Sequence, residues 1–213
     1  MPSSPGPENR RAAAVQLFQA GIDDLREALD QIGRAQWDSL FDLAEMVQTC
    51  WQRGGKLLIC GNGGSAADSQ HIAAELVGRF LKDRRGFPAL ALTTNSSILT
   101  AVANDYGFEQ IFARQVEALG RPEDVLLTIS TSGNSPNCVE AVAAARRVGM
   151  TVAGFLGQEG GLLRDLVDLT LVVPSGATPK IQEIHITMGH LLCRLLEIWQ
   201  TETEPDAGRD GDG

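Results

Sequence analysis

The residues best suited to chemistry in this chain are His71 and Glu75, which follow a glycine-rich segment. On a helix, their spacing of four positions places the imidazole and the carboxylate one turn apart on the same face. Such a pair can transfer a proton or bind a metal ion. The apolar run 57–60 ends at Gly61–Ser65 (GNGGS), and a strand, glycine turn and helix start together form a site for an anionic group. The stretch suggests an enzyme that acts on a small phosphorylated molecule.

A second polar segment, Ser130–Ser135 (STSGNS), follows the apolar run 125–130 and precedes a helix expected from Pro136. Hydroxyl groups and the free N–H groups of a helix start can bind phosphate oxygens without a basic side chain. One serine at a helix start is often only an N-cap, but four hydroxyls exceed what capping requires. We therefore favour phosphate binding by Ser130, Thr131, Ser132 and Ser135.

A third polar segment, Thr93–Ser97, is followed by Asn104 and Asp105. These two side chains are candidate partners for sugar hydroxyls. Turn and capping roles explain the segment equally well, so both interpretations stay open.

Two of the chain's three histidines, His185 and His190, fall on a helix expected over 179–200. Gln182 and His190 are eight residues apart on roughly the same side, which is about 12 Å along a helix. Their side chains converge only by leaning toward each other. A histidine on an apolar helix is more often a core residue than a ligand, so a structural role is open for both His185 and Glu183.

The elements that must position these residues alternate between apolar runs and helical patterns. The expected strands are 56–60, 89–92, 125–130, 151–156 and 169–173. The expected helices after residue 56 are 64–80, 97–118, 136–148, 160–166 and 179–200, and residues 9–53 show two helical apolar stripes. This alternation predicts an α/β fold with a five-stranded parallel sheet sandwiched by helices. Ligands bind such sheets outside the carboxyl ends of the strands, where the polar segments fall.

The composition limits the class of protein. The chain has 213 residues and a net charge of −9, which argues against a nucleic-acid surface. We predict one domain over 9–200 between disordered ends at 1–8 and 201–213. No apolar run is long enough to span a membrane, and the N-terminus lacks the apolar core of a signal peptide. The four cysteines lie in apolar segments without Cys-x-x-Cys spacing, so we expect buried, reduced thiols in a cytoplasmic protein.

Together these motifs resemble the sugar isomerase (SIS) domain and, within it, the phosphoheptose isomerases. The resemblance covers about residues 10–200 and is carried by CGNGGSAADSQHIAAELVGRF, TSGNSPN and TPKIQEIHITMGH. It implies a flavodoxin-like sheet whose N-terminal helices pack in an oligomer, typically a homotetramer with active sites between subunits. It also implies conversion of sedoheptulose 7-phosphate to D-glycero-D-manno-heptose 7-phosphate through an enediol, the first step of nucleotide-activated heptose biosynthesis.

The resemblance also assigns residues. It implies one Zn²⁺ per subunit, held by His71, Glu75, Gln182 and His190, with Glu75 and His190 transferring protons. The phosphate would bind Ser130, Thr131, Ser132 and Ser135. The rest of the substrate would contact Asn62, Gly63, Gly64, Ser65, Asn104, Asp105 and Gln182.

One departure and one alternative accompany this resemblance. Pro179–Lys180 stands where family members often have a small or acidic residue and then Arg, and Lys lacks the planar fork of Arg. Other SIS domains are non-catalytic: they sense a sugar phosphate or act as tetrameric adaptors, such as the replication-initiator-binding type. An adaptor would share the GNGGS and hydroxyl segments but would not need both Glu75 and His190. Their joint presence favours an enzyme.

Overall fold

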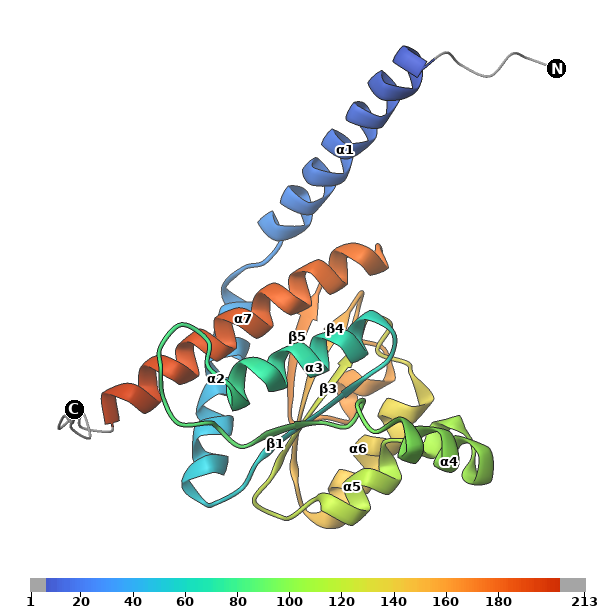
Figure 1. Ribbon diagram of the computed structural model, residues 1–213. Helices are drawn as coiled ribbons and strands as arrows, with labels where there is room; N and C mark the ends of the chain where they lie inside the picture. The colour runs from blue at the N-terminus through green and yellow to red at the C-terminus, as the bar shows by residue number, and fades with distance from the viewer. Residues whose placement is uncertain (1–6, 204–213) are drawn as a thin grey trace, which may run out of the picture.

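The computed structural model describes residues 7–203, which form a five-stranded sheet with helices on both faces (Figure 1). The strands are β1 (Leu57–Gly61), β2 (Ala89–Ala91), β3 (Val125–Ser130), β4 (Thr151–Gly157) and β5 (Leu169–Val173). They lie in the order β2-β1-β3-β4-β5, and every neighbouring pair is parallel. This doubly wound order is that of flavodoxin-like sheets, which confirms the predicted fold class.

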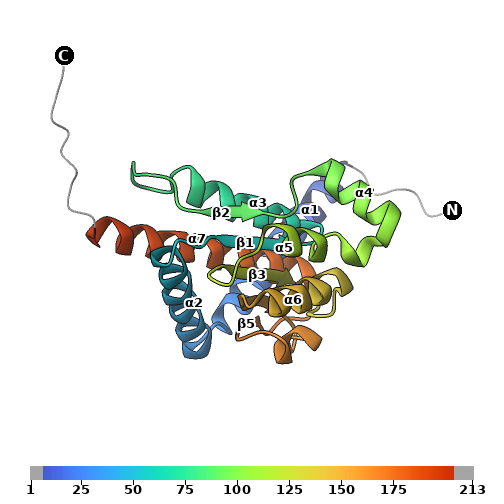
Figure 2. The same cartoon turned by 90° about the horizontal axis from the view of Figure 1, so that it is seen from below.

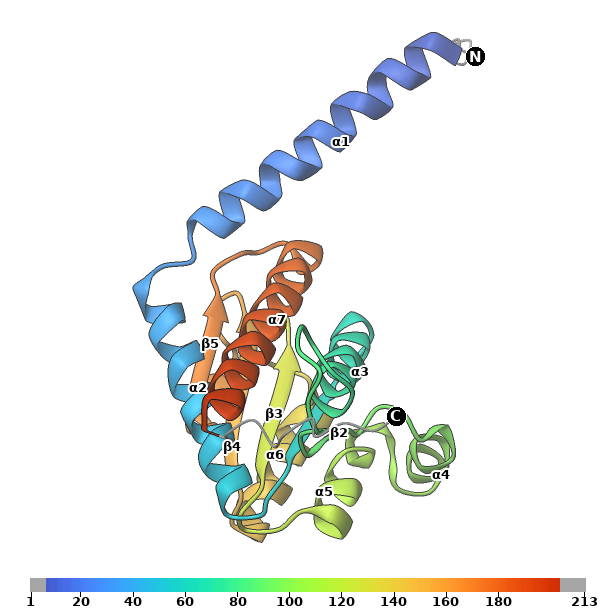
Figure 3. The same ribbon diagram turned by 60° about the vertical axis from the view of Figure 1, so that its left-hand side comes forward.

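The register brings the carboxyl ends of the strands together at one edge. Gly61, at the end of β1, lies opposite Ile129 of β3, and Ser130 lies opposite Leu156 of β4. The GNGGS and hydroxyl segments therefore leave neighbouring strands side by side. Figure 3 shows β3 and β5 pointing toward this edge.

Helices cover the two faces of the sheet, as Figure 2 shows from below. One face carries α2 (Arg34–Gln52), α3 (Gly64–Val77) and α7 (Thr178–Thr203), whose buried side chains share one core with the sheet. The other face carries α4 (Ser96–Tyr106), η1 (Phe108–Gln110), α5 (Ala113–Leu119), α6 (Pro136–Val148) and η2 (Leu162–Asp165). The helix pair α3 and α7, which bears the predicted ligands, packs together on the first face.

Alternation along the strands fills both cores. Leu57 and Ile59 of β1 join the core under α2, α3 and α7, whereas Leu58 and Cys60 join the opposite core. All four are fully buried, and burying a Leu or Ile side chain stabilises the fold by roughly 1.5–3 kcal/mol. A strand buried on both faces reads as a continuous apolar run, which is why the sequence predicts it well. All four cysteines are buried free thiols, as expected.

Three expected helices differ from the observed ones. The helix expected over 64–80 ends at Val77, before Gly78. The helix expected over 97–118 divides into α4, η1 and α5 at Gly107, whose φ of 96° suits glycine. Within 160–166 only the short 3₁₀ helix η2 forms, because Gly160 and Gly161 also have positive φ.

The first helix, α1 (Pro7–Asp30), projects from the body of the molecule (Figures 1 and 3). Its expected apolar stripe is exposed: the exposed fractions of Leu17 and Phe18 are 70% and 68%. The ammonium of Lys180 donates to the Gly21 carbonyl at 2.9 Å and thereby ties α1 to the start of α7.

The chain ends are only partly described. Helix α1 begins at Pro7 and α7 ends at Thr203, beyond the limits of 9 and 200 expected for the ordered domain. The remainder of the predicted disordered ends lies outside the described residues, and the single domain over 9–200 stays a prediction. Among the described residues, no helix combines the length and apolar character needed to cross a membrane.

Candidate functional site

Three of the predicted ligands meet between α3 and α7 of a single chain. His71 and Glu75 lie one turn apart on α3, with 3.2 Å between His71 Nε2 and Glu75 Oε1. His190 of α7 brings its Nε2 atom to 3.0 Å from His71 Nε2. One donor atom from each residue falls within 4.8 Å of the other two. The packing of α3 on α7 thus completes within one subunit a group whose parts lie 119 residues apart.

Two of the three donor separations are close to those found around a small metal ion. Zinc takes histidine nitrogen and carboxylate oxygen at about 2.0–2.2 Å in a tetrahedron, which places neighbouring donors about 3.3 Å apart. The observed separations, 3.0 Å between the Nε2 atoms of His71 and His190 and 3.2 Å between His71 Nε2 and Glu75 Oε1, are close to that value. The side chain of His71 is 46% exposed and that of Glu75 is 26% exposed, so the group is accessible to a small molecule.

Gln182, the fourth predicted ligand, lies two turns before His190 on α7. Its carboxamide packs against Gly64, where a Cβ atom would approach Gln182 Nε2 to 2.5 Å. Gly64 is the first residue of α3, seven residues before His71, which is about 10 Å along the helix. The structure therefore places Gln182 on the same helix interface as His71 and His190, but closer to the glycine segment than those two histidines are.

His185 is a structural residue, one of the two roles that the sequence left open. It is fully buried, and its Nε2 atom lies 3.1 Å from the Leu156 carbonyl oxygen. A carbonyl only accepts, so Nε2 carries a proton, and Nδ1 is buried with no hydrogen-bond partner among the described residues. Burial lowers the pKa of His185 to about 4. Glu183 is exposed and pairs with Lys180.

Asp68 is a carboxyl that sequence reasoning did not single out. It lies one turn before His71 on α3, and its Oδ2 atom is buried with no hydrogen-bond partner among the described residues. Desolvation raises the pKa of Asp68 to about 6, while the charge of nearby His71 acts in the opposite direction. A search for acids one turn before a predicted ligand would have found it.

The hydroxyl segment forms a turn at the start of α6. Ser130 Oγ and Ser135 Oγ lie 3.1 Å apart, and the Gly133 N–H donates to Ser130 Oγ. Ser135 occupies the N-cap position of α6, but its side chain makes no capping bond. The hydroxyl thus faces the turn, and the capping interpretation does not hold for it. Gly133 packs directly on the backbone of Gly160. The φ of Gly133 is 65°, a conformation that suits glycine.

A side-chain pair joins the two anion-binding segments. Asn62 donates to Asn137, and Asn137 donates back to Asn62, each at 2.8 Å. Asn137 is 1% exposed on the first turn of α6. Paired buried amides satisfy each other's donors and acceptors. Sequence reasoning included Asn62 but missed Asn137, which is the last residue of the TSGNSPN motif.

The remaining glycine-segment residues sit at the start of α3. Gly63 has φ 55° and no side chain caps the helix there, so its exposed N-terminus offers N–H groups to an anion. Gly64 contacts Gln182, and Ser65 is buried. The segment is thus placed between the hydroxyl turn and the helix interface.

His71, Glu75 and His190 are together called the His–Glu group. Asn104 and Asp105 lie apart from the His–Glu group of their own chain. They are exposed on α4, where Asn104 donates to Asp105 at 2.8 Å. Helix α4 stands away from α7 in Figures 1 to 3. In the third polar segment, Asn95 is the N-cap of α4 and accepts from the Ile98 N–H, which is the capping role that the sequence left open.

Comparison with known proteins defines the class. Residues 22–157 match the family model described as SIS domain. The chain is 58% identical over 190 residues to the phosphoheptose isomerase of Desulfovibrio desulfuricans, covering 89% of this chain and 90% of that protein. It is 55% identical over 183 residues to that of Roseiflexus sp., covering 86% of this chain and 91% of that protein.

A solved structure agrees. The phosphoheptose isomerase of Neisseria gonorrhoeae superposes with a TM-score of 0.81 at 41% identity, covering 86% of this chain and 99% of that one. The fold and the matched model therefore define a SIS-domain protein. More particularly, the chain belongs to the phosphoheptose isomerase family.

Proposed function

We propose that this protein is an aldose–ketose isomerase that converts sedoheptulose 7-phosphate to D-glycero-D-manno-heptose 7-phosphate. One observation carries the proposal: His71, Glu75 and His190 meet within 4.8 Å of one another where α3 packs on α7. A pocket that only sensed a sugar phosphate would not need this group. The shared name of the relatives supports the same activity.

The proposed substrate runs from the hydroxyl turn toward the helix interface. Its phosphate binds the hydroxyls of Ser130, Thr131, Ser132 and Ser135 and the start of α6. Its middle carbons contact Asn62–Ser65 and Gln182. The reacting carbons C1 and C2 then lie at Glu75 and His190, so an extended, open-chain sugar phosphate is required.

The group fits Zn²⁺ in donor type and spacing, as the 3.0 and 3.2 Å separations indicate. His71, Glu75 and His190 would hold the ion, with Gln182 as the fourth ligand expected from the family resemblance. When bound, zinc supplies Lewis-acid polarisation of sugar oxygens.

The protein groups move the protons. Glu75 removes a proton from C1, and His190 donates one to the C2 oxygen from Nδ1, the ring nitrogen that does not face His71, which gives the enediol. Glu75 then returns its proton to C2 while His190 takes the proton of the C1 oxygen, so that charge and atoms balance. A carboxylate has two oxygens, and Oε1 of Glu75 lies 3.2 Å from His71 Nε2. The second oxygen allows one residue to serve as both ligand and base.

A homo-oligomer, most simply a tetramer, belongs to the proposal. Leu17, Phe18 and Ile22 of α1 are more than half exposed, and an apolar helix face of this kind needs a partner. Asn104 and Asp105 are exposed away from their own His–Glu group, so contact with substrate places them in a neighbouring subunit's site. A cytoplasmic location without nucleic-acid or membrane partners completes the proposal.

The test is turnover of sedoheptulose 7-phosphate by purified protein, with the zinc content measured in the same sample. We expect stoichiometric zinc and formation of the aldose phosphate. Shorter ketose phosphates, assayed alongside, define the chain-length preference. A protein without metal or turnover that binds another protein tightly would instead be an adaptor.

A further inference from the structure

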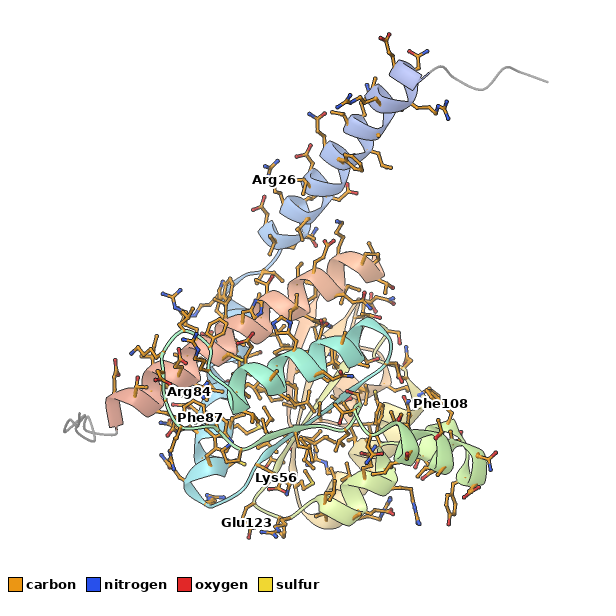
Figure 4. The ribbon with its side chains drawn as sticks, in the orientation of Figure 1. Arg26, Lys56, Arg84, Phe87, Phe108 and Glu123 are labelled. Atoms are coloured by element: carbon orange, nitrogen blue, oxygen red, sulfur yellow. The ribbon has the colours of Figure 1, made fainter. Side chains whose placement is uncertain are left out.

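The guanidinium of Arg84 closes the end of the helix that carries His71 and Glu75. It donates to the carbonyl oxygens of Glu75 at 2.9 Å, Leu76 at 2.8 Å and Gly78 at 3.2 Å. These are the carbonyls that a helix end leaves without partners. A cation there also interacts favourably with the helix dipole. Arg84 lies in the loop after α3, over the ring of Phe87 at 3.8 Å (Figure 4).

Glu197 of α7 holds the other side of this loop. Its carboxylate accepts from three successive backbone N–H groups, those of residues 80–82, at 3.0–3.2 Å. It also accepts from Arg84 Nε at 3.2 Å. The exposed fractions of the two side chains are 2% and 5%. A buried carboxylate needs hydrogen-bond donors in place of the water it has lost, and here one carboxylate and one guanidinium join α7, the loop and α3.

The loop reaches the catalytic group through Phe80. The Phe80 N–H is one of the donors to Glu197, and its ring stacks on the imidazole of His190 with centroids 5.7 Å apart and planes at 27°. His190 and Glu197 are seven residues apart on α7, two turns on one helix face. The carboxylate therefore fixes the backbone whose aromatic ring covers one face of His190.

We propose that Arg84, Glu197 and Phe80 are positioning residues for the His71–Glu75–His190 group. Arg84 fixes the end of α3 behind Glu75, and Glu197 fixes the same loop to α7. Phe80 sets the ring plane of His190. This inference rests on the proposed isomerase function for its catalytic consequence, but its consequence for metal affinity is independent of the substrate.

A buried ion pair is by itself weak support for stability, because desolvation offsets much of the attraction. A second buried ion pair, Lys56–Asp124, is the matched control that distinguishes an effect on positioning from an effect on stability. Asp124 is 1% exposed, pairs with Lys56 at 2.6 Å and accepts two backbone N–H groups. It precedes β3, and its hydrogen-bond partners are Lys56 and Arg121, which lie outside the His71–Glu75–His190 group. Asp124→Asn therefore removes the same chemistry from a carboxylate that is hydrogen-bonded to Lys56 and Arg121 and not to the loop after α3.

The experiment compares Glu197→Gln, Arg84→Lys and Phe80→Leu with Asp124→Asn. Zinc affinity of metal-free protein is measured by competition with a chromogenic chelator, alongside kcat, KM and urea unfolding. Changing a residue that orients a metal ligand typically weakens metal affinity about 10–100-fold, and we expect that range for Glu197→Gln and Arg84→Lys. We expect kcat to fall at least about tenfold with KM within about threefold, since orientation and not substrate binding is lost.

The control separates the outcomes. Asp124→Asn should lose comparable stability while zinc affinity and kcat stay within about twofold of the wild type. Phe80→Leu, which breaks no ion pair, tests the ring contact even where Glu197→Gln fails to fold. Zinc affinities unchanged in folded Arg84→Lys and Phe80→Leu would overturn the inference. A wild type that binds zinc but does not isomerise the sugar would overturn the proposed function alone, and the affinities would still judge the positioning.

Discussion

The Nε2 atoms of His71 and His190 face each other at 3.0 Å across the interface of α3 and α7. Two neutral imidazoles can share one hydrogen bond at this distance, but two imidazolium rings would repel each other. Glu75 adds an oxygen at 3.2 Å from His71. The same three atoms can therefore release protons and bind a cation. The helix packing that produces this contact is the central feature of the site.

The first prediction concerns metal binding. His71→Asn and His190→Asn should each reduce zinc affinity by more than about 100-fold. Each removes a ligand itself, whereas changing a residue that only orients a ligand already costs up to about 100-fold. Chelator competition on metal-free protein measures this. His185→Gln is the matched control, since His185 is buried against Leu156 in the core. Equal zinc affinity in His190→Asn and His185→Gln would contradict the assignment.

The second prediction concerns the base. Glu75→Gln should lower kcat by about 10²–10⁴, the usual contribution of a positioned proton-transfer group. Binding of the phosphate should persist, because Ser130–Ser135 lies in a separate segment. Steady-state kinetics measure the change in kcat. Inhibition of the wild type by inorganic phosphate, compared with direct phosphate binding to the variant, shows whether the phosphate site persists. A Glu75→Gln enzyme that remains active would show that another group takes the C1 proton.

The third prediction uses a glycine to test Gln182. In Gly64→Ala the new Cβ would stand 2.5 Å from Gln182 Nε2, so the flexible carboxamide has to move. Stability should change little, whereas zinc affinity and kcat should fall in parallel with those of Gln182→Ala. Gly21→Ala is the control, because nothing lies within 4 Å of its added Cβ. Unchanged zinc affinity in both Gly64→Ala and Gln182→Ala would remove Gln182 from the metal ligands.

The fourth prediction concerns the pair that joins the two loops. Asn137→Ala leaves the Asn62 amide without its partner, which destabilises the fold by about 1–3 kcal/mol. It should also raise KM for the sugar phosphate, since both segments proposed to bind it lose their mutual support. Urea unfolding and steady-state kinetics measure these effects. Asn95→Ala removes the α4 cap at a cost of about 1 kcal/mol and should leave KM unchanged. An equal KM in the two variants would contradict the linking role.

The sequence predicts local features of this protein well. His71 and Glu75 share a helix, so their spacing alone places them together. The buried strands were recognisable because apolar residues continue along both faces, as at Leu57 to Cys60. The division of the helix expected over 97–118 could not be predicted, because the residues on both sides of Gly107 continue a helical pattern.

Contacts between distant segments were less accessible. The family resemblance, and not the spacing, paired His190 with His71. Nothing in the sequence indicated that Arg84 and Glu197, 113 residues apart, would form a buried ion pair. Charged residues are usually exposed, so a charge in a loop and a charge on a helix are both expected at the surface. Their burial follows from the docking of the loop on α7, which only the tertiary structure shows.

The last prediction concerns pH. Burial holds the pKa of His185 at about 4, against about 6.5 in an unfolded chain. Above pH 6.5 the ring is neutral in both states, so its stabilising contribution is complete. As the pH falls from 6.5 toward 4, the unfolded state binds a proton first, and this stability is lost.

Between pH 7 and pH 4.5 this one group should therefore remove about 2–3 kcal/mol of unfolding free energy from the wild type. His185→Gln keeps a donor for the Leu156 carbonyl but does not titrate, so its stability should fall less over the same interval. Urea unfolding of both proteins at the two pH values measures the difference. The stability gap between them should narrow as the pH falls; parallel pH dependences would show that His185 keeps an ordinary pKa in the fold and that its burial carries no proton-linked cost.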